Sequence, residues 1–320
     1  MLGNPHRTRA LSGTEAMARP WLKRCLPRNV FEALTFWMRL GYWPNLRHPG
    51  TFNEKISCRK LHEVPFAHPN LVDKLAVREF VAERVGAQYL TRILRVFDAP
   101  SDVRLCDLPT AFALKCNTGS GMNLLVRDAS RVSDRSLAAA CSRWVSQPYS
   151  TLSHSYECIY DGVAVKVFAE ELLAPLESVQ EYKFWCFDGR PEFIQTSWRE
   201  DKRRTYRLFD RDWIPCPFGV FNAPNPIPLE RPACLADMLR LAACLSAEFD
   251  FARIDLNVTA ECRITFGEIT FHPGGGRARF FPAHYDAVYG ARIPLRSTRR
   301  SPTGGPRCPQ PHAEEAAVDA

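Results

Sequence analysis

Apolar residues recur at roughly helical spacing in several segments of the chain. The predicted helices are Trp21–Leu40, Asp73–Val85, Ser133–Val145 and about Cys234–Phe249. Gly86 directly follows the second segment, and we expect it to end that helix because glycine readily adopts helix-terminating conformations.

Other segments have the short apolar or alternating patterns that are typical of strands. The predicted strands are Phe112–Lys115, Val163–Glu170, Tyr182–Phe187, Glu192–Ser197, Ala252–Val258 and Cys262–Phe271. Tyr182–Phe187 and Glu192–Ser197 are expected to form a hairpin across the turn Asp188-Gly189-Arg190-Pro191. A proline-rich stretch, residues 215–232, separates this hairpin from the last predicted helix. The order of elements, without an internal repeat, predicts a mixed α and β fold.

The composition is typical of a globular protein, with 46% apolar and 24% charged residues in 320. This length fits one large domain or two modest ones. The net charge of +7 is spread along the chain, which favours a solvated surface first and a pocket for anionic substrates second. Because there is no basic stripe with interleaved aromatic residues, we expect no nucleic-acid partner.

The two ends of the chain differ in composition from its middle. Residues 1 to about 20 have no apolar core of a signal peptide, and no stretch approaches ~18 uninterrupted apolar residues. The twelve cysteines are scattered without metal-site spacing. These features predict a cytoplasmic protein without a transmembrane segment. Beyond about Leu295 the chain is rich in proline, glycine and charge, which predicts a disordered tail.

The strongest candidate site lies in residues 251–276. Asp255 and Glu268 lie on adjacent predicted strands, so strand pairing is expected to bring both carboxylates to one end of a sheet. Carboxylates together with nucleotide phosphates are the usual ligands of Mg²⁺. Arg253 points to the same face as Asp255 and is placed to meet a transferring phosphoryl group. The alternative is that these are ordinary charges on a solvated sheet face.

A second candidate site is the segment FALKCNTGSGMNLLV, residues 112–126. Lys115 leaves a predicted strand and enters a loop that contains Gly119, Ser120 and Gly121. A fixed cation and backbone N–H groups in such a loop can meet phosphate oxygens. The loop is not a Walker motif, because no Gly-Lys-Ser/Thr follows, and a plain turn is the alternative.

Other polar residues gain weight mainly from their order along the chain. Asp73 can cap the predicted helix, and Lys74 would add charge beside its N-terminal backbone donors. Glu170 and Glu171 end a predicted strand and are placed to contact an adenine amino group or ribose hydroxyls. Lys183 and Glu181 face the same side of their strand. The alternative for each is a solvated strand or helix residue.

In chain order, these motifs are similar to the pattern of the ATP-grasp superfamily. HPGTFNEKI at residues 48–56 and EYKFWCFDG at residues 181–189 resemble its TupA-like group, named for a teichuronopeptide biosynthesis protein. The resemblance covers roughly residues 45–295. It implies an α+β ATP-grasp fold in which two α+β subdomains clamp a nucleotide. The implied domains are a leader with a helical extension (1–44), the ATP-grasp domain (45–295) and the tail (296–320).

The resemblance also implies roles for individual residues in binding ATP and Mg²⁺. Lys74 and Lys115 would contact the α- and β-phosphates, Glu170 with Leu172 or Leu173 would lie at the adenine hinge, and Glu181 would reach the ribose. Lys183 and Arg253 would face the γ-phosphate or an acyl phosphate, and Asp255 and Glu268 would hold magnesium. Many ATP-grasp enzymes have Glu-x-Asn at the last metal site, whereas this chain has Glu268-Ile269-Thr270. A threonine hydroxyl is a poorer metal ligand than an amide carbonyl, so a second Mg²⁺ is less secure.

The implied reaction transfers a phosphoryl group from ATP to a carboxylate, and an amine then attacks the acyl phosphate to form an amide. The expected partners are small-molecule or polymer-precursor carboxylates and amines, with only peripheral association with envelope-polymer machinery. A glycosyltransferase of polysaccharide synthesis is one alternative, and turnover of ATP against a UDP-sugar would separate the two. A non-catalytic nucleotide-binding module is another, which would bind nucleotide without turnover.

Overall fold

The computed structural model describes residue 23 and residues 25–62, 68–152, 156–173, 179–200, 203–225 and 228–294, with the backbone alone for residues 198–200 and 203–204. The expected leader and the expected tail therefore lie almost wholly outside the described residues. None of the described helices combines the length and the apolar character needed to cross a membrane. The cysteines in the described ranges are free thiols.

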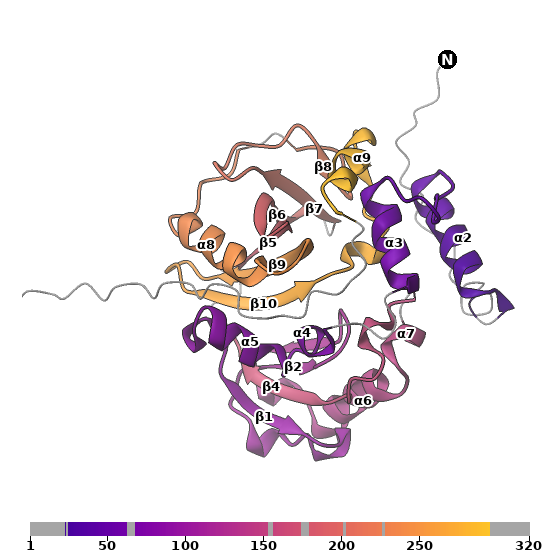
Figure 1. Ribbon diagram of the computed structural model, residues 1–320. Helices are drawn as coiled ribbons and strands as arrows, with labels where there is room; N and C mark the ends of the chain where they lie inside the picture. Colours follow the sequence, from indigo (N-terminus) through magenta and orange to yellow (C-terminus); the bar gives the residue numbers. More distant parts are fainter. Residues whose placement is uncertain are drawn as a thin grey trace, which may run out of the picture.

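Two antiparallel sheets dominate the fold (Figure 1). The smaller sheet has the order β1-β4-β2-β3, with β1 (Ile93–Phe97), β2 (Phe112–Cys116), β3 (Asn123–Val126) and β4 (Val167–Glu171). The larger sheet has the order β10-β9-β5-β6-β7, with β5 (Gln180–Phe187), β6 (Arg190–Glu200), β7 (Arg203–Phe209), β9 (Phe251–Val258) and β10 (Ile264–Thr270). A two-stranded pair joins β8 (Gly219–Val220) to β11 (Phe280–Phe281).

Helices cover the sheets and connect them. They are α2 (Arg28–Leu40), α3 (Phe52–His62), α4 (Pro69–Val72), α5 (Val77–Arg84), α6 (Asp134–Val145), α7 (Tyr149–Leu152), α8 (Leu235–Ser246) and α9 (His284–Ala291). In Figure 1, α4 and α5 lie between the two sheets, next to β10. The mixed α and β architecture expected from the sequence is confirmed.

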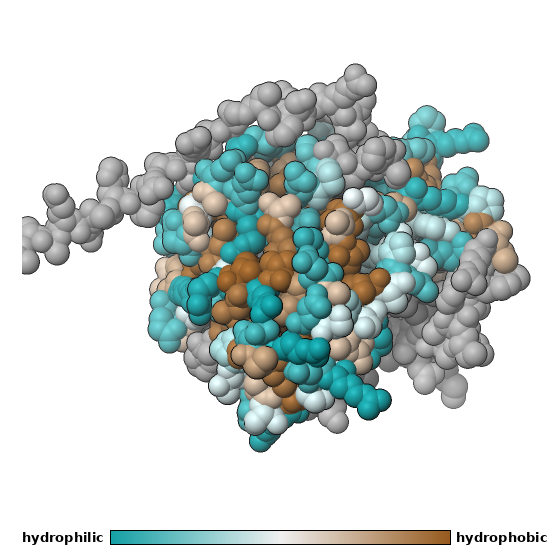
Figure 2. Space-filling view, turned by 90° about the horizontal axis from the view of Figure 1, so that it is seen from below, coloured by the Kyte–Doolittle hydropathy of each residue, from teal (hydrophilic) through white to brown (hydrophobic). Residues whose placement is uncertain are grey.

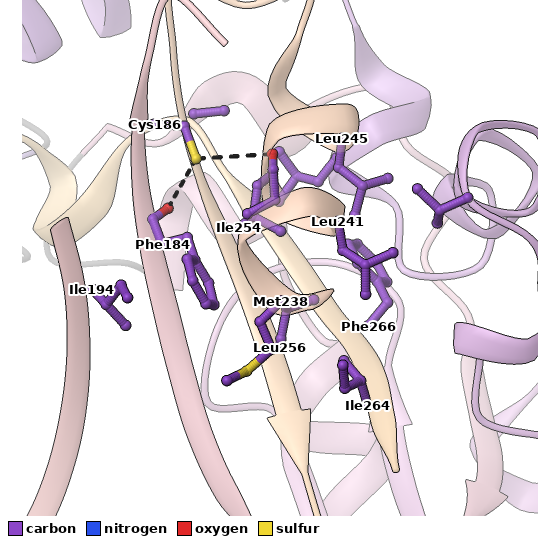
Figure 3. Close-up of a cluster of buried hydrophobic side chains, with 14 of the residues drawn as sticks. Phe184, Cys186, Ile194, Met238, Leu241, Leu245, Ile254, Leu256, Ile264 and Phe266 are labelled. Atoms are coloured by element: carbon purple, nitrogen blue, oxygen red, sulfur yellow. Dashed lines mark hydrogen bonds between the residues drawn. The ribbon is translucent and has the colours of Figure 1, made fainter. Parts of the chain in front are cut away.

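Each sheet has its own apolar core. Leu137 and Cys141 of α6 pack against Phe112 and Leu114 of the smaller sheet. The α8 helix packs against β5 and β9 of the larger sheet, where the Cys186 thiol lies 3.9 Å from the Ala242 carbonyl oxygen (Figure 3). Seen from the side of the smaller sheet, apolar patches are interspersed with hydrophilic residues (Figure 2).

The opposite face of the larger sheet is divided into two halves. At one end, α3 and α9 cover an aromatic cluster that includes Phe52, Trp185, Phe251 and Tyr289. The Phe52 and Phe251 rings lie 4.9 Å apart between centroids. At the other end, the same face of β5, β9 and β10 carries charged residues. Packing therefore fixes the strands at one end and leaves polar side chains at the other.

The β5–β6 hairpin is confirmed and is longer than predicted. Its tight turn consists of Asp188 and Gly189, with φ angles of 49° and 73°. Two consecutive positive φ values suit an Asp-Gly pair and match the twist of the flanking strands. Phe187 pairs directly with Arg190, so the turn is shorter than the four residues expected.

Several predicted boundaries are wrong by a few residues. The helix expected from Asp73 begins at Val77, because the Asp73 carboxylate accepts the amide hydrogen of Leu75 at 2.8 Å and closes a turn before the helix. The strand expected from Val163 begins at Val167; the Lys166 amide donates to the Asn117 side chain at 2.7 Å and not to a neighbouring strand. The strands β1, β3, β7, β8 and β11 were not predicted.

A buried ion network joins α2 and α3 to the segment after β10. Lys60 of α3 is 2% exposed, and its Nζ lies 2.7 Å from Glu32 Oε1 of α2. The other carboxylate oxygen of Glu32 accepts from Arg277 at 3.0 Å, and Lys60 donates to the Gly275 carbonyl at 2.6 Å. Burial lowers the pKa of Lys60 to about 8, although Glu32 opposes the shift.

We predict that Lys60→Met lowers the free energy of unfolding by about 3 kcal/mol, because it leaves the buried Glu32 carboxylate short of one cation. Arg131→Met serves as the control, since Arg131 is 84% exposed and pairs with the exposed Asp128. This control should lose less than about 0.5 kcal/mol. Chemical denaturation of both variants measures the difference, and equal losses would contradict a structural role for the buried network.

Candidate functional site

Four polar or charged side chains lie on one face of β9 and β10. The register pairs Asp255 with Glu268 and Arg253 with Thr270. Residues directly opposite each other in an antiparallel pair point to the same side of the sheet, and Ile254 between them points to the core under α8. The prediction that strand pairing brings the two carboxylates together is confirmed.

A bulge at Gly267 places Glu268 on this face. The pairing shifts between Phe266, which is opposite Leu256, and Glu268, which is opposite Asp255. Side chains alternate along a regular strand, so without the extra residue Glu268 would share the core side with Phe266. A Cβ atom on Gly267 would lie 2.9 Å from the Asp255 carbonyl oxygen, so the close approach of the two strands requires glycine.

Arg253 connects both carboxylates. Its Nε and Nη2 donate to the two oxygens of Asp255, each at 2.7 Å, and Nη2 also donates to Glu268 Oε1 at 3.2 Å. The Thr270 hydroxyl accepts from Arg253 at 3.0 Å and donates to Glu268 Oε1 at 2.9 Å. A bidentate guanidinium–carboxylate pair is strong and geometrically specific, so it fixes Arg253 and Asp255 on β9. The further contacts with Glu268 and Thr270 extend this network to β10.

Lys183 of β5 completes the cluster. It lies opposite Asp255 in the register, and its Nζ donates to Asp255 Oδ2. The same ammonium lies 2.8 Å from Glu181 Oε1. Lys183 and Glu181 therefore face one side of the sheet, as predicted. The cluster combines two cations with three carboxylates on a partly buried surface.

The electrostatics keep Asp255 ionised. Burial alone would raise the pKa of Asp255, which is 1% exposed, but Arg253 and Lys183 outweigh burial and hold that pKa below its ordinary value. The pKa of Arg253 responds in the opposite sense: burial would lower it, but Asp255 and Glu268 raise it. Asp255 and Arg253 therefore stabilise each other's charged forms.

The smaller sheet contributes a second ion pair. Lys115 of β2 binds Glu170 of β4, and the Thr91 hydroxyl donates to the other Glu170 oxygen at 2.8 Å. Neither Lys115 nor Glu170 belongs to the core beneath α6, because both alternate with the residues that face it. Glu170 is only 6% exposed. Its carboxylate is thus used to orient Lys115 in this structure.

The end of β4 is held by contacts of the Glu171 side chain. Glu171 Oε1 accepts from the Arg92 amide at 3.0 Å, and Arg263 of the larger sheet's β9–β10 turn also donates to it. Leu172 and Leu173 follow directly and are half-buried. Glu170 and Glu171 therefore point to different partners, and Glu171 connects the two sheets.

The glycine loop lies against Lys74. The Lys74 amide donates to the Asn117 carbonyl at 2.9 Å, and its Nζ donates to the Gly119 carbonyl. Gly119 has a φ of 73°, and a Cβ atom there would overlap the Tyr149 ring of α7. Ser120 and Gly121 are exposed. Burial lowers the pKa of Lys74, although Glu268 opposes this shift.

A small pocket joins the two groups of residues. Its polar lining consists of Lys74, Tyr160, Glu268 and the backbone at Gly267, and apolar residues of α4, α5 and β10 complete it. The lysine at the glycine loop and the carboxylate of the β9–β10 pair therefore share one cavity, although they are 194 positions apart in the chain. The sequence predicted each of these residues as a site residue but did not predict that they line one pocket.

Two residues at this pocket were missed by the sequence analysis. Tyr160 lines it, and Tyr149 packs against Tyr160 with 5.0 Å between ring centroids. Both lie in short turns and helices, where no periodic pattern marks one face. Only their proximity to the glycine loop and to β10 in the folded protein identifies them.

The metal-binding capacity of the site depends on few protein ligands. Within the described ranges, no group of three or more His, Cys, Asp or Glu side chains is placed to hold a metal ion by itself. Asp255 and Glu268 supply two carboxylates. That number suits Mg²⁺ when phosphate oxygens and water supply its remaining ligands.

Comparison with known proteins gives one family match. The model of the family described as TupA-like ATPgrasp matches residues 54–294 of this chain. No curated protein matches.

Among solved structures, the chain is similar to an L-amino acid ligase from Bacillus licheniformis, at 14% identity, TM-score 0.42, and coverage of 73% of this chain and 50% of that one. It is also similar to an ATP complex of D-alanine–D-alanine ligase from Bacillus anthracis, at 15% identity and a TM-score of 0.37, with coverage of 62% of this chain and 54% of that one. It is similar as well to an ADP complex of N5-carboxyaminoimidazole ribonucleotide synthetase, at 13% identity and a TM-score of 0.37, with coverage of 63% of this chain and 45% of that one. The chain spans about half the length of each of these proteins.

We predict that Gly267→Ala lowers the free energy of unfolding by about 1–3 kcal/mol, because the new methyl group would press on the Asp255 carbonyl and disturb the bulge. Gly50→Ala is the matched control, since the atom nearest to its new Cβ, an oxygen of Glu54, would lie 3.9 Å away. Thermal and chemical denaturation compare the two variants. An unchanged stability of Gly267→Ala would show that the bulge tolerates a side chain.

Proposed function

Because the chain belongs to the TupA-like ATP-grasp family, we propose that it is an ATP-dependent ligase that joins a carboxylate to an amine through an acyl phosphate. The proposed setting is the synthesis of a cell-surface polysaccharide or a teichuronopeptide-type polymer, and the proposed substrates are small molecules or polymer precursors. The catalytic domain would comprise residues 45–295. The observation that carries the proposal is the joining of Arg253, Asp255 and Glu268 on one sheet face.

The oxygen donors on β9 and β10 fit a magnesium ion. Asp255 and Glu268 would hold it, because hard carboxylate oxygens suit Mg²⁺. When bound, the ion would neutralise phosphate charge and orient the transferring group. Thr270 already donates to Glu268, so we propose that it positions this carboxylate and is not a direct ligand.

Lys183 and Arg253 supply the positive charge at the reacting end. Both are held in place by Asp255 on a face that is largely shielded from water. Charges that are fixed before the reaction need little rearrangement as negative charge develops on the transferred phosphoryl group and its acceptor. Positioning and charge are sufficient for this chemistry, so a Ser, Cys or His nucleophile is not required.

The nucleotide would occupy the space between the two sheets. Lys74 and Lys115 are proposed to contact its α- and β-phosphates, and the backbone of Gly119, Ser120 and Gly121 would close over them. Because the Glu170 and Glu171 side chains are engaged elsewhere, the proposed adenine contacts fall to the backbone of Glu170, Leu172 and Leu173. Glu181 would reach the ribose.

A sugar-nucleotide transferase gains no support from the Asp-x-Asp sequence of this chain, Asp210-Arg211-Asp212, which follows the edge strand β7. Asp210 Oδ1 accepts the amide hydrogens of Asp212 at 2.9 Å and Ile214 at 2.8 Å, which closes a turn after β7. The carboxylate is used for this turn and is not directed at Asp255. Release of ADP, compared with release of UDP from a UDP-sugar, tests the choice directly.

We predict that Glu268→Gln abolishes ADP release from Mg-ATP but leaves the melting temperature nearly unchanged, because the Glu268 side chain is 34% exposed and only its charge is removed. Asp255→Asn should abolish ADP release and also lower the stability by about 3 kcal/mol, since it leaves two buried cations without their shared carboxylate. The assay would use amino acids, uronic acids and amino sugars as acceptors. Normal turnover in both variants would refute the magnesium assignment.

We predict that Lys115→Ala weakens ATP binding by ~2 kcal/mol, the contribution of one charge-assisted hydrogen bond to a phosphate. Lys166→Ala is the control, because Lys166 precedes β4 and forms an exposed pair with Asp98 at 3.7 Å. Isothermal titration of ATP compares the variants, and their unfolding curves verify the fold. Wild-type affinity in Lys115→Ala would exclude a phosphate contact at this position.

A further inference from the structure

The α2 helix is apolar on two faces. One face packs against the rest of the protein and buries Phe31 and Phe36. The opposite face also carries apolar residues, at the spacing i, i+4, i+7 and i+8 that forms one stripe along a helix, namely Val30, Leu34, Trp37 and Met38. Val30, Trp37 and Met38 are 42%, 48% and 37% exposed. The outer face of a helix in a globular protein is normally polar, so this stripe indicates an interaction surface.

Trp43 extends the stripe beyond the end of the helix. Gly41 ends α2 with a φ of 86°, and its amide donates to the Trp37 carbonyl at 2.8 Å. The indole rings of Trp37 and Trp43 then lie 6.3 Å apart between centroids. Trp43 is 61% exposed, and the preceding Tyr42 is held by a hydrogen bond from its hydroxyl to Asp286 at 2.9 Å. The two indoles therefore form one exposed aromatic patch on a turn that is anchored to α9.

The exposed charges beside this patch are positive. Arg39 at the end of α2 and Arg47 in the following loop are both exposed. Arg279 adds a third cation, since its guanidinium would lie 3.7 Å from a Cβ atom on Gly41. Between residues 28 and 50 the sequence contains one acidic residue, Glu32, which is buried in the ion network that joins α2 to α3. The patch is therefore complementary in charge to an anionic partner.

An anionic lipid bilayer fits both the apolar and the basic character of this surface. Tryptophan favours the boundary between lipid headgroups and acyl chains, because its ring is largely apolar and its N–H is polar. Arginine side chains beside it would meet the negative headgroups. In Figure 1, α2 lies at the outer edge of the molecule, and α3 lies between it and the larger sheet. This position makes α2 accessible to an extended, flat partner.

We propose that the protein docks on an anionic lipid bilayer through the α2 surface, which consists of Val30, Leu34, Trp37, Met38 and Trp43. The helix has 13 residues. Because about 20 are needed to span a bilayer, α2 would lie in the plane of the interface. Its apolar side chains would enter the headgroup region, and Arg39 and Arg47 would contact lipid phosphates. This inference goes beyond the proposed ligase activity and does not depend on it.

Cosedimentation of the full chain with lipid vesicles, without nucleotide, tests the inference. The wild type should bind vesicles that contain phosphatidylglycerol about tenfold more tightly than vesicles of phosphatidylcholine alone, because its arginines lie near the headgroups. Trp37→Ser/Trp43→Ser should weaken binding to the anionic vesicles about tenfold, since apolar contact with the bilayer is lost. Arg39→Gln/Arg47→Gln should also bind the anionic vesicles about tenfold more weakly, and should bind the neutral vesicles like the wild type.

Leu125→Ser/Ile214→Ser is the matched control. Leu125 of β3 and Ile214 after β7 are 48% and 59% exposed, so this variant also removes two exposed apolar side chains, but away from α2. It should bind the vesicles like the wild type. All variants should keep a melting temperature close to that of the wild type, because the replaced side chains are exposed.

A wild type that does not bind the anionic vesicles would overturn the inference. Wild-type affinity in the tryptophan variant would also overturn it, as would an equal loss in the control, because binding would then not depend on the α2 surface. Failure to bind vesicles, combined with a dimer in sedimentation velocity that the tryptophan variant abolishes, would show that the α2 surface joins two copies of this chain instead. None of these results bears on ADP release, so the proposed function is tested separately.

Discussion

The pairing of Asp255 with Glu268 is the constraint on which the candidate site depends. It exists because one extra residue, Gly267, shifts the register of β10 just before Glu268. Upstream of the bulge, Ile264 and Phe266 face the core under α8, and downstream of it Ile269 does so. Because of the bulge, the residues on either side of Ile269, Glu268 and Thr270, face the site instead.

Charge balance explains how the larger sheet tolerates this face. A buried carboxylate without partners would be strongly disfavoured, but Asp255 has a cation on each neighbouring side, from its own strand and from β5. The cost of ordering these long side chains is reduced because the same strands are already fixed by the aromatic cluster under α3 and α9. The aromatic cluster and the charged residues thus lie next to each other on one face of the sheet. The rigid aromatic end holds the charged end in position.

The sequence was sufficient to predict the strands β9 and β10 and the side shared by Lys183 and Glu181, because each follows from alternation along a strand. Strand pairing also predicted that Asp255 and Glu268 meet, but the face of the sheet on which they meet depends on the bulge at Gly267. The sequence was not sufficient to predict the bulge, since Gly267 looks like any glycine in a strand until the pairing partner is known. Tyr160 was missed for a related reason: it lies in a turn without periodicity, and only tertiary packing brings it to Glu268. The β1 and β3 strands escaped prediction because they lie at the two edges of their sheet and have mixed burial.

The glycine loop and the segment after β10 differ in how firmly they are held. After β10, the chain is fixed by Lys60 and Arg277, both of which donate to the Gly275 carbonyl from a buried ion network. In the glycine loop, Ser120 and Gly121 are exposed, and no atom lies within 4 Å of a Cβ built on Gly121. Local opening requires little free energy where few buried contacts are lost. Opening of the tip of the glycine loop would therefore cost less free energy than opening of the segment after β10, which the buried ion network holds next to the strand that carries Glu268.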